Sequence, residues 1–342
     1  MSKPIACRAA RHIRSNRINV RMMPKSLDRH VQWLHDLPAR TALRFCNHPY
    51  FREALGQRHE EALALHRPRL PRLSALGREI VDALEQDGVF ITQIDALGLS
   101  GSEAMIDSSA MLAERFAREA HARAARGETF LYVPPEQIAA SPRIFRWGLH
   151  DQLLDIAESY IGLPVAYDGA IINYTVADGR EVSTRKWHRD WEDRRMLKVA
   201  VYLHNVDHAG GPFQIISRHG STQNDRSGFS YELATEDELE DRLGVPVAPY
   251  LVSCEGLRGT VIFTDTARFY HRGKPATARD RTVIFYSYFA QQPRHPFLCE
   301  RSGMRRRDLY RLARDLPERQ QSAILWRRKL TPLMRLIPPA SL

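Results

Sequence analysis

Apolar residues recur at helical spacing through the first quarter of the chain. Between residues 26 and 87 they return every three or four positions, which predicts helices that each bury one face. Pro68 and Pro71 separate these helices into two groups, because proline has no backbone N–H with which to continue a helix. Gly88 is placed to end the last of them. The same spacing predicts two further helices, over residues 102–126 and 149–161.

From residue 89 onward the pattern changes to short apolar runs separated by turn residues. Valine, isoleucine, tyrosine and phenylalanine dominate these runs, which is typical of strands. The predicted strands cover residues 89–92, 164–176, 197–203, 210–216, 259–271 and 281–289. We expect the last strand to be antiparallel to the one before it. Strands framed by helices at both ends predict a mainly β fold with helical wrapping, built on a double-stranded β-helix (a cupin-like jelly roll).

The chain divides into four predicted parts. They are a basic arm at residues 1–25, a helical extension at 26–74, the β-helix domain at 75–300 and a basic amphipathic segment at 301–342. Within the domain, an insertion at about 222–252 carries an acidic helix. We expect it to act as a lid, since long loops between strands commonly carry function.

Composition indicates a globular protein without a membrane span. Mean hydropathy is −0.41, and no apolar run approaches the roughly 20 residues that a bilayer requires. The four cysteines are scattered without a Cys-x-x-Cys pair, so neither a zinc ribbon nor a disulfide framework is indicated. We therefore expect a reducing, cytoplasmic location.

Positive charge is concentrated at the two ends. Residues 1–30 carry a net +7 and residues 301–342 a net +8, so the body between them carries −5 of the total of +10. An acidic body argues against specific nucleic-acid binding through the centre of the domain. The arginine-rich N-terminus is compatible with a mitochondrial transit peptide or with a basic disordered arm, and we favour the arm.

The C-terminal segment leaves two interpretations open. Its apolar residues fall at near-helical spacing among arginines: Trp326, Leu330, Leu333, Met334 and Ile337. Such a segment either lies on an anionic membrane surface, where each cation contributes roughly 1 kcal/mol, or packs on the domain. Pro332 interrupts a continuous helix, or begins a second one that Thr331 caps.

The candidate chemistry begins with the sequence Trp-His-Arg-Asp at residues 187–190. Successive side chains of an extended segment alternate between two faces, so His188 and Asp190 point the same way. This pair is weak evidence by itself, because a chain with 14 histidines produces chance matches.

Two later residues make the signal specific. His271 ends a predicted strand 83 residues after His188, and Arg281 opens the next strand. Two histidines and one carboxylate are the facial ligand set of non-haem Fe(II) oxygenases, and a guanidinium binds a carboxylate through two parallel hydrogen bonds. Together they predict a ferrous site beside a cation that holds the far end of a dicarboxylate co-substrate.

With these motifs the chain resembles the phytanoyl-CoA dioxygenase-like family of Fe(II)/2-oxoglutarate-dependent oxygenases, over roughly residues 75–292. The matching stretches lie at residues 84–91, 187–190, 197–203, 210–216, 259–263 and 271–281. The resemblance implies that His188, Asp190 and His271 bind Fe(II) and that Arg281 pairs with the C5 carboxylate of 2-oxoglutarate. It also implies that O2 is consumed, that succinate and CO2 are released, and that an unactivated C–H bond of a small anionic or lipid-linked substrate is hydroxylated.

Other residues near the motif are candidates for binding. Asn173 and Tyr202 lie on strands expected to face the co-substrate, and they would either hydrogen-bond it or be satisfied polar groups of the core. The substrate candidates are Trp187, Arg189, Trp191, Arg194, Gln214 and Arg268. The arginines would hold an anionic substrate or form a solvated rim. Lys198 is interpreted as a strand-edge cation, and the remaining histidines near the motif, His204, His208 and His219, as ordinary polar residues.

Two other function classes stay open. A non-catalytic jelly-roll binder would keep the fold but would have no need of Arg281 after His271. An oxygenase acting on a nucleic acid or a polyanion-bound substrate would use the same chemistry, and the acidic body disfavours it. Nucleotide hydrolases, α/β-hydrolases and Rossmann enzymes are disfavoured because the sequence lacks a Walker loop, a Gly-x-Ser-x-Gly elbow and a Gly-x-Gly-x-x-Gly turn.

Overall fold

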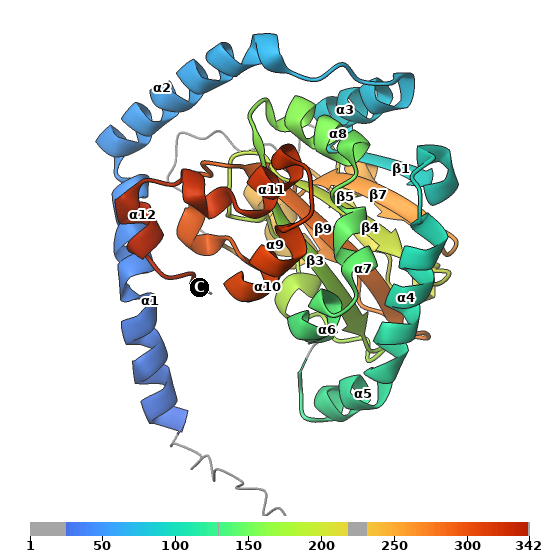
Figure 1. Ribbon diagram of the computed structural model, residues 1–342. Helices are drawn as coiled ribbons and strands as arrows, with labels where there is room; N and C mark the ends of the chain where they lie inside the picture. Colours follow the sequence, from blue (N-terminus) through green and yellow to red (C-terminus); the bar gives the residue numbers. More distant parts are fainter. Residues whose placement is uncertain (1–24, 129, 218–230, 341–342) are drawn as a thin grey trace, which may run out of the picture.

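Two antiparallel sheets form the centre of the molecule. The computed structural model describes residues 25–128, 130–217 and 231–340, and Figure 1 shows their arrangement. The larger sheet has the strand order β1-β7-β4-β9-β3-β2, and the smaller has the order β6-β5-β8. The strands are β1 Val89–Gln93, β2 Phe130–Tyr132, β3 Val165–Thr175, β4 Leu197–Tyr202, β5 Phe213–Ile216, β6 Leu251–Cys254, β7 Thr260–Asp265, β8 His271–Gly273 and β9 Arg281–Ala290.

Helices surround the two sheets. They are α1 Lys25–Asn47, α2 Pro49–His66, α3 Ala75–Asp87, α4 Ser102–Arg115, α5 Ala117–Ala125, α6 Pro135–Ala139, α7 Pro142–Trp147, α8 Asp151–Ile161, α9 Glu236–Leu243, α10 Arg306–Ala313, α11 Glu318–Ile324 and α12 Pro332–Leu336. Helices α4, α7, α8 and α11 cover the outer face of the larger sheet and contact β3, the long strand beside the edge strand β2. The expected combination of a jelly-roll-like β core and helical wrapping is confirmed.

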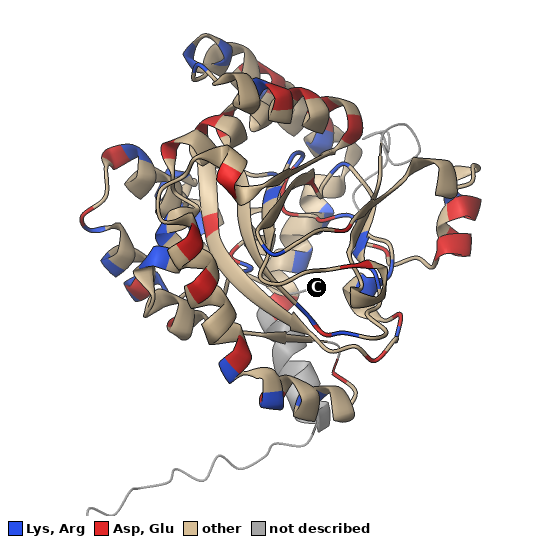
Figure 2. Cartoon of the chain, turned by 90° about the vertical axis from the view of Figure 1, so that its right-hand side faces the viewer, with Lys and Arg blue, Asp and Glu red and all other residues tan. Residues whose placement is uncertain are grey.

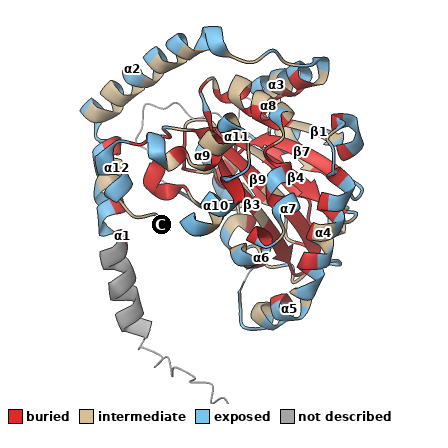
Figure 3. Cartoon of the chain, viewed as in Figure 1, coloured by how far each residue is buried: buried red, intermediate tan, exposed pale blue. Residues whose placement is uncertain are grey.

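The larger sheet is buried on both faces, and the two-residue period of its strands decides which side chains face the helices. On β4, Leu197, Val199 and Val201 pack into the helical layer, while Ala200 and Tyr202 pack against the smaller sheet. Strand β9 alternates in the same way. Figure 3 shows the buried residues concentrated in the sheets, with exposed residues on the outer helices. The face turned toward the smaller sheet is therefore the interior in which a site can form.

The partner of the last strand differs from our expectation. Strand β9 does not pair with β7, the preceding strand of the same sheet, but with β4 and β3. Strand β4 is antiparallel to both β7 and β9, so β7 and β9 run in the same direction. The chain makes this possible by crossing to the smaller sheet as β8 before it returns.

The helical predictions hold with two adjustments. The long N-terminal stretch divides at His48 as well as at the two prolines, and Gly88 ends α3 in the left-handed conformation, as expected. The predicted helix over residues 102–126 is two helices, because Phe116 departs from helical geometry with φ −101° and ψ 2° and packs against the core. Helix α9 begins with a capping box between Thr235 and Glu238. The first part of the predicted lid, together with His219, lies outside the described residues.

The C-terminal segment packs on the domain. Trp326 and Leu330 are buried beside Phe289 of β9, and Ile337 packs near Ala39 of α1. After α10 and α11, the segment continues as a 3-10 turn and then α12, which Thr331 caps, and outer residues such as Leu333 are exposed. The tryptophan that would anchor it in a membrane is thus part of the core. No helix in the described ranges combines the length and apolar character that crossing a bilayer requires.

Lys and Arg lie interspersed with Asp and Glu over the outer helices (Figure 2). Many of them pair, such as Arg319 of α11 with Asp155 and Glu158 of α8 at 2.6 and 2.9 Å. Half-exposed pairs of this kind contribute little stability each. The basic arm at residues 1–24 lies outside the described residues.

Gly88 provides a test of the packing beneath β1. Its φ of +74° is strained for other residues, and an added Cβ would lie 2.4 Å from the ring of Phe269. Gly98 has a similar φ of +61° but open space around it. Gly98→Ala should therefore cost roughly 1–2 kcal/mol from backbone strain alone, and Gly88→Ala roughly 1–3 kcal/mol more from overpacking. Urea unfolding measures both; equal losses would contradict the packing described.

Candidate metal centre

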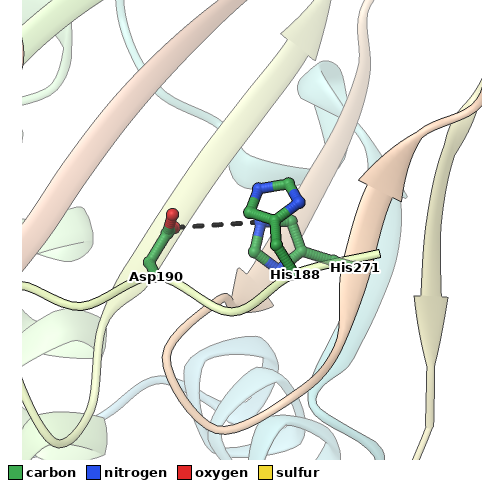
Figure 4. A group of neighbouring side chains, drawn as sticks. All are labelled: His188, Asp190 and His271. Atoms are coloured by element: carbon green, nitrogen blue, oxygen red, sulfur yellow. Dashed lines mark ion pairs between the residues drawn. The ribbon is translucent and has the colours of Figure 1, made fainter. Parts of the chain in front are cut away.

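Backbone hydrogen bonds bring the two histidines of the motif together. His188 and His271 form an isolated antiparallel bridge, with N–H to O distances of 3.1 and 2.9 Å in the two directions. Their ring centroids are 4.3 Å apart. The Asp190 N–H donates to Thr266 O at 2.7 Å, which fixes the third residue on the same side. Figure 4 shows the three side chains converging.

The three side chains are spaced as ligands of a single ion. One donor atom from each of His188, Asp190 and His271 lies within 4.8 Å of the other two. The closest ion-pair contact among them is 3.9 Å, between His271 Nε2 and Asp190 Oδ2. The alternation predicted for residues 188 and 190 therefore puts both on the side that faces His271.

The orientation of each imidazole leaves one nitrogen available. His188 Nδ1 lies 2.8 Å from Lys186 O, and His271 Nδ1 lies 3.2 Å from Phe269 O. A carbonyl only accepts, so each Nδ1 carries the proton and donates. Nε2 is then the unprotonated nitrogen that can bind a metal, and a metal-binding histidine is ordinarily held through its other ring nitrogen in this way.

Burial sets the charges of the cluster. It lowers the pKa of both histidines, and His188 lowers that of His271 further, to about 3. Burial raises the pKa of Asp190, but the Lys198 ammonium and the two imidazoles outweigh it, so the net pKa lies well below the usual range. At neutral pH the cluster is two neutral imidazoles and one carboxylate, which is the protonation state that metal binding requires.

Arg281 lies in the same cavity as these ligands. The cavity holds about 150 Å³, and His188, Asp190, His271 and Arg281 all line it. The guanidinium donates to Gly211 O and approaches Thr175 Oγ1 at 3.5 Å. Its Nε has no hydrogen-bond partner within the described structure. Burial lowers the pKa of Arg281, and nearby Arg185 adds to this. A buried cation with spare donors needs an anionic ligand, because an unpaired buried charge is costly.

A glycine makes room for this guanidinium. A Cβ at Gly273, the last residue of β8, would lie 2.6 Å from Nη2 of Arg281. Any larger residue would displace the guanidinium from the cavity wall. Gly273 carried no signal in the sequence, since its role appears only when β8 and β9 are brought together.

Asn173 and Tyr202, the two predicted co-substrate contacts, differ in how fully their polar groups are already hydrogen-bonded. Asn173 lines the cavity and accepts a hydrogen bond from Thr175 Oγ1 at 3.1 Å, which leaves its amide N–H2 available. Tyr202 also lines the cavity, but its hydroxyl donates to Cys254 O at 2.7 Å and accepts from the Phe213 N–H at 3.0 Å. Tyr202 is therefore engaged in joining β4 to the smaller sheet, the core role that the sequence left open.

The residues expected to contact substrate lie elsewhere among the described residues. Trp187 is fully buried beneath Arg272, whose guanidinium stacks 4.3 Å from its ring, and Gln214 accepts a hydrogen bond from Arg272 Nε. Arg268 pairs with Glu85 at 3.1 Å. Strand alternation explains the positions of Trp187 and Gln214, because each adjoins a cavity-lining residue and so turns away from the cavity.

The other three candidates also pack outside the cavity lining. Arg189 lies over the ring of Tyr270 at 5.3 Å, and the ring of Trp191 contacts that of Tyr231. The Arg194 N–H donates to the side chain of Asp193. The described residues therefore do not form a basic rim of Arg189, Arg194 and Arg268 around the cavity.

Three cations that line the cavity were missed or misread from the sequence. Lys198 is not a plain strand-edge cation but points inward from β4, and its ammonium pairs with Asp190. Arg185 is buried and pairs with Asp178. Arg301, which follows the domain, reaches back to the cavity and stacks 5.0 Å from Trp191. Lys198 and Ala200 are two residues apart on β4, so their side chains lie on the same face of the sheet. This spacing is the only sequence signal that could have shown that Lys198 points into the cavity.

The histidines interpreted as ordinary polar residues behave so where they are described. His204 Nε2 accepts a hydrogen bond from the Thr282 N–H at 2.8 Å. His208 is exposed and lies 3.7 Å from Glu255.

No protein-family model matches the sequence, and no curated protein sequence matches it significantly. Solved structures with some similarity include EctD from S. alaskensis with 2-oxoglutarate and 5-hydroxyectoine, at 21% identity and TM-score 0.44, over 64% of this chain and 76% of that one. HygX from Streptomyces hygroscopicus with iron bound has 16% identity and TM-score 0.42, over 62% and 86%. The non-heme alpha ketoglutarate dependent epimerase SnoN has 17% identity and TM-score 0.40, over 64% and 84%. At these scores, the chemistry of this chain has to be inferred from its own side chains.

The cluster predicts metal-dependent stabilisation. A ligand that binds only the folded state at a hundred times its Kd adds about 2.7 kcal/mol, so anaerobic Fe(II) should raise the Tm of the purified protein. His188→Ala should abolish the rise, while His208→Ala, which changes an exposed histidine outside the cluster, should keep it. A rise that survives in His188→Ala would place the metal elsewhere.

Proposed function

We propose that the protein is an Fe(II)/2-oxoglutarate-dependent dioxygenase that hydroxylates a C–H bond of a small molecule. The single observation that carries the proposal is one cavity lined both by the cluster of His188, Asp190 and His271 and by the buried Arg281. A metal cluster alone fits many metals, and a buried arginine alone fits many anions. Their combination fits a metal bound together with a dicarboxylate.

Each residue has a defined task in this reaction. His188, Asp190 and His271 would hold Fe(II), and the bound ion would provide the sites at which 2-oxoglutarate and O2 react. Arg281 binds the C5 carboxylate, which fixes the direction in which the co-substrate lies. The bound iron supplies the oxidising chemistry that couples cleavage of O2 to decarboxylation. One O2 and one 2-oxoglutarate are consumed for each succinate, CO2 and hydroxylated product.

Hydroxylation is favoured over halogenation because Asp190 supplies a carboxylate where a halogenating enzyme needs a small residue. Desaturation and ring closure use the same ligands. The small size of the cavity favours a small-molecule substrate over a nucleic acid or a polyanion-bound one. A non-catalytic binder would keep the same sheets, but it would gain nothing from freeing both Nε2 atoms beside a carboxylate. We also propose that the protein belongs to the narrower phytanoyl-CoA dioxygenase-like family, and this assignment is supported by the resemblance of its sequence motifs.

Turnover of the co-substrate tests the function directly. We expect succinate to form from 2-oxoglutarate only with Fe(II) and O2, and to stop when a chelator removes the metal. Asp190→Ala should reduce succinate release by more than the roughly 10–100-fold that loss of a group supporting a metal ligand costs, while His208→Ala should not. Succinate formation at the same rate in Asp190→Ala would remove the oxygenase assignment.

Gly273 tests the position of the co-substrate independently of the metal ligands. Gly273→Ala brings a methyl group against Arg281 Nη2, so the KM for 2-oxoglutarate should rise at least tenfold while Fe(II) binding is unchanged. Arg281→Met should produce a similar rise, since a charge-assisted hydrogen bond contributes roughly 1.5–3 kcal/mol. An unchanged KM in both variants would show that the C5 carboxylate binds elsewhere.

A further inference from the structure

Lys198 and Arg301 line the same cavity as Arg281 but occupy a different part of it. Arg281, Val283, Phe285 and Ser287 alternate along β9 and all line the cavity. Lys198 is opposite Ser287 in the register between β4 and β9. Six residues along a strand cover roughly 20 Å. Lys198 therefore lies at the other end of the row from Arg281, beside the metal ligand Asp190.

With 2-oxoglutarate bound to Arg281, the charges of the cavity would balance at that end but not at the Lys198 end. The described lining contains four cations, Arg185, Lys198, Arg281 and Arg301, and a single carboxylate, that of Asp190. Arg185 pairs with Asp178, outside the lining, and Arg281 is assigned to the co-substrate. Lys198 pairs directly with Asp190, and the buried Glu192 carboxylate attracts it more weakly. A metal bound to Asp190 would draw on the same carboxylate charge and weaken its pairing with Lys198.

Arg301 is also only weakly paired with a carboxylate in the described structure. Its closest carboxylate contact is 3.9 Å, between Nε and Glu192 Oε1, and its guanidinium stacks 5.0 Å from the centre of Trp191. The side chain is 41% exposed and also lines the cavity. The lining also includes the polar Ser287, opposite Lys198, and the apolar or aromatic side chains of Tyr132, Ile171 and Phe285.

We propose that Lys198 and Arg301 form a second anion-binding site, which holds a carboxylate or phosphate group of the substrate. This inference rests on the proposed function, because the metal must take over Asp190 for Lys198 to need a new partner. An ammonium that loses its carboxylate inside a cavity is costly unless another anion replaces it. The substrate class is then a small acid with an apolar body, bound with its C–H bond near the metal and its charged group at Lys198 and Arg301.

The test uses short acids and a matched neutral molecule as probes. The full-length protein is loaded anaerobically with Fe(II) and saturating 2-oxoglutarate, and the visible absorption band of the iron and 2-oxo acid chelate is recorded. Hexanoate, hexyl phosphate and hexanamide are then titrated. Hexanoate or hexyl phosphate should perturb the band saturably, and the better of the two identifies the preferred acid group. Hexanamide should bind at least tenfold more weakly.

Variants assign the effect to the two cations. Lys198→Met and Arg301→Met should each weaken binding of the better acid at least tenfold while the chelate band still forms. Lys198→Arg should retain more affinity than Lys198→Met. Arg195→Met is the matched control, since Arg195 pairs with Glu85 outside the cavity lining, and it should bind like the wild type.

The outcomes separate the two proposals. If the chelate band does not form in the wild type, the proposed function fails and the inference falls with it. If the band forms but neither acid binds better than hexanamide, or both methionine variants bind like the wild type, the anion site is refuted and the oxygenase assignment stands.

Discussion

The antiparallel bridge between His188 and His271 is the contact on which the site depends. It joins two segments that lie 83 residues apart in the sequence, and its two hydrogen bonds set the separation of the imidazoles. Each imidazole is then oriented by a backbone carbonyl two residues earlier, Lys186 O for one and Phe269 O for the other. The ligand geometry is thus built almost entirely from backbone, which makes it rigid before a metal arrives.

The larger sheet forms much of the rest of the cavity wall, because side chains alternate between the two faces along each of its strands. Its central strands are covered by helices on one side and by the smaller sheet on the other, so alternate residues serve two different interiors. The same alternation puts Arg281 and Lys198 in one cavity and turns Arg189 and Gln214 away from it. A register slip of one residue would turn the cavity-facing side chains outward and destroy the site. The apolar side chains buried on both faces of the sheet hold it in the register that the site needs.

Local spacing in the sequence was enough to predict most of the elements and the metal cluster. His188 and Asp190 are separated by one residue in an extended segment, so their shared direction follows from strand geometry alone. Lys198, Arg185 and Arg301 were not identified because their approach to the cavity depends on strand pairing and on the return of the chain after β9. Arg194 and Arg268 were named as substrate contacts because they are close to the motifs in the sequence, but they do not line the cavity. Closeness along the chain does not fix the direction of a side chain.

The function depends on one metal ion bound by three side chains in the cavity that Arg281 also lines. Crystals grown anaerobically with Fe(II) and 2-oxoglutarate, measured at the iron absorption edge, test it most directly. We expect one anomalous peak in direct contact with Nε2 of His188, Nε2 of His271 and the Asp190 carboxylate, with a carboxylate of the co-substrate on the Arg281 guanidinium. A peak away from these three residues, or a co-substrate that does not reach Arg281, would contradict the account.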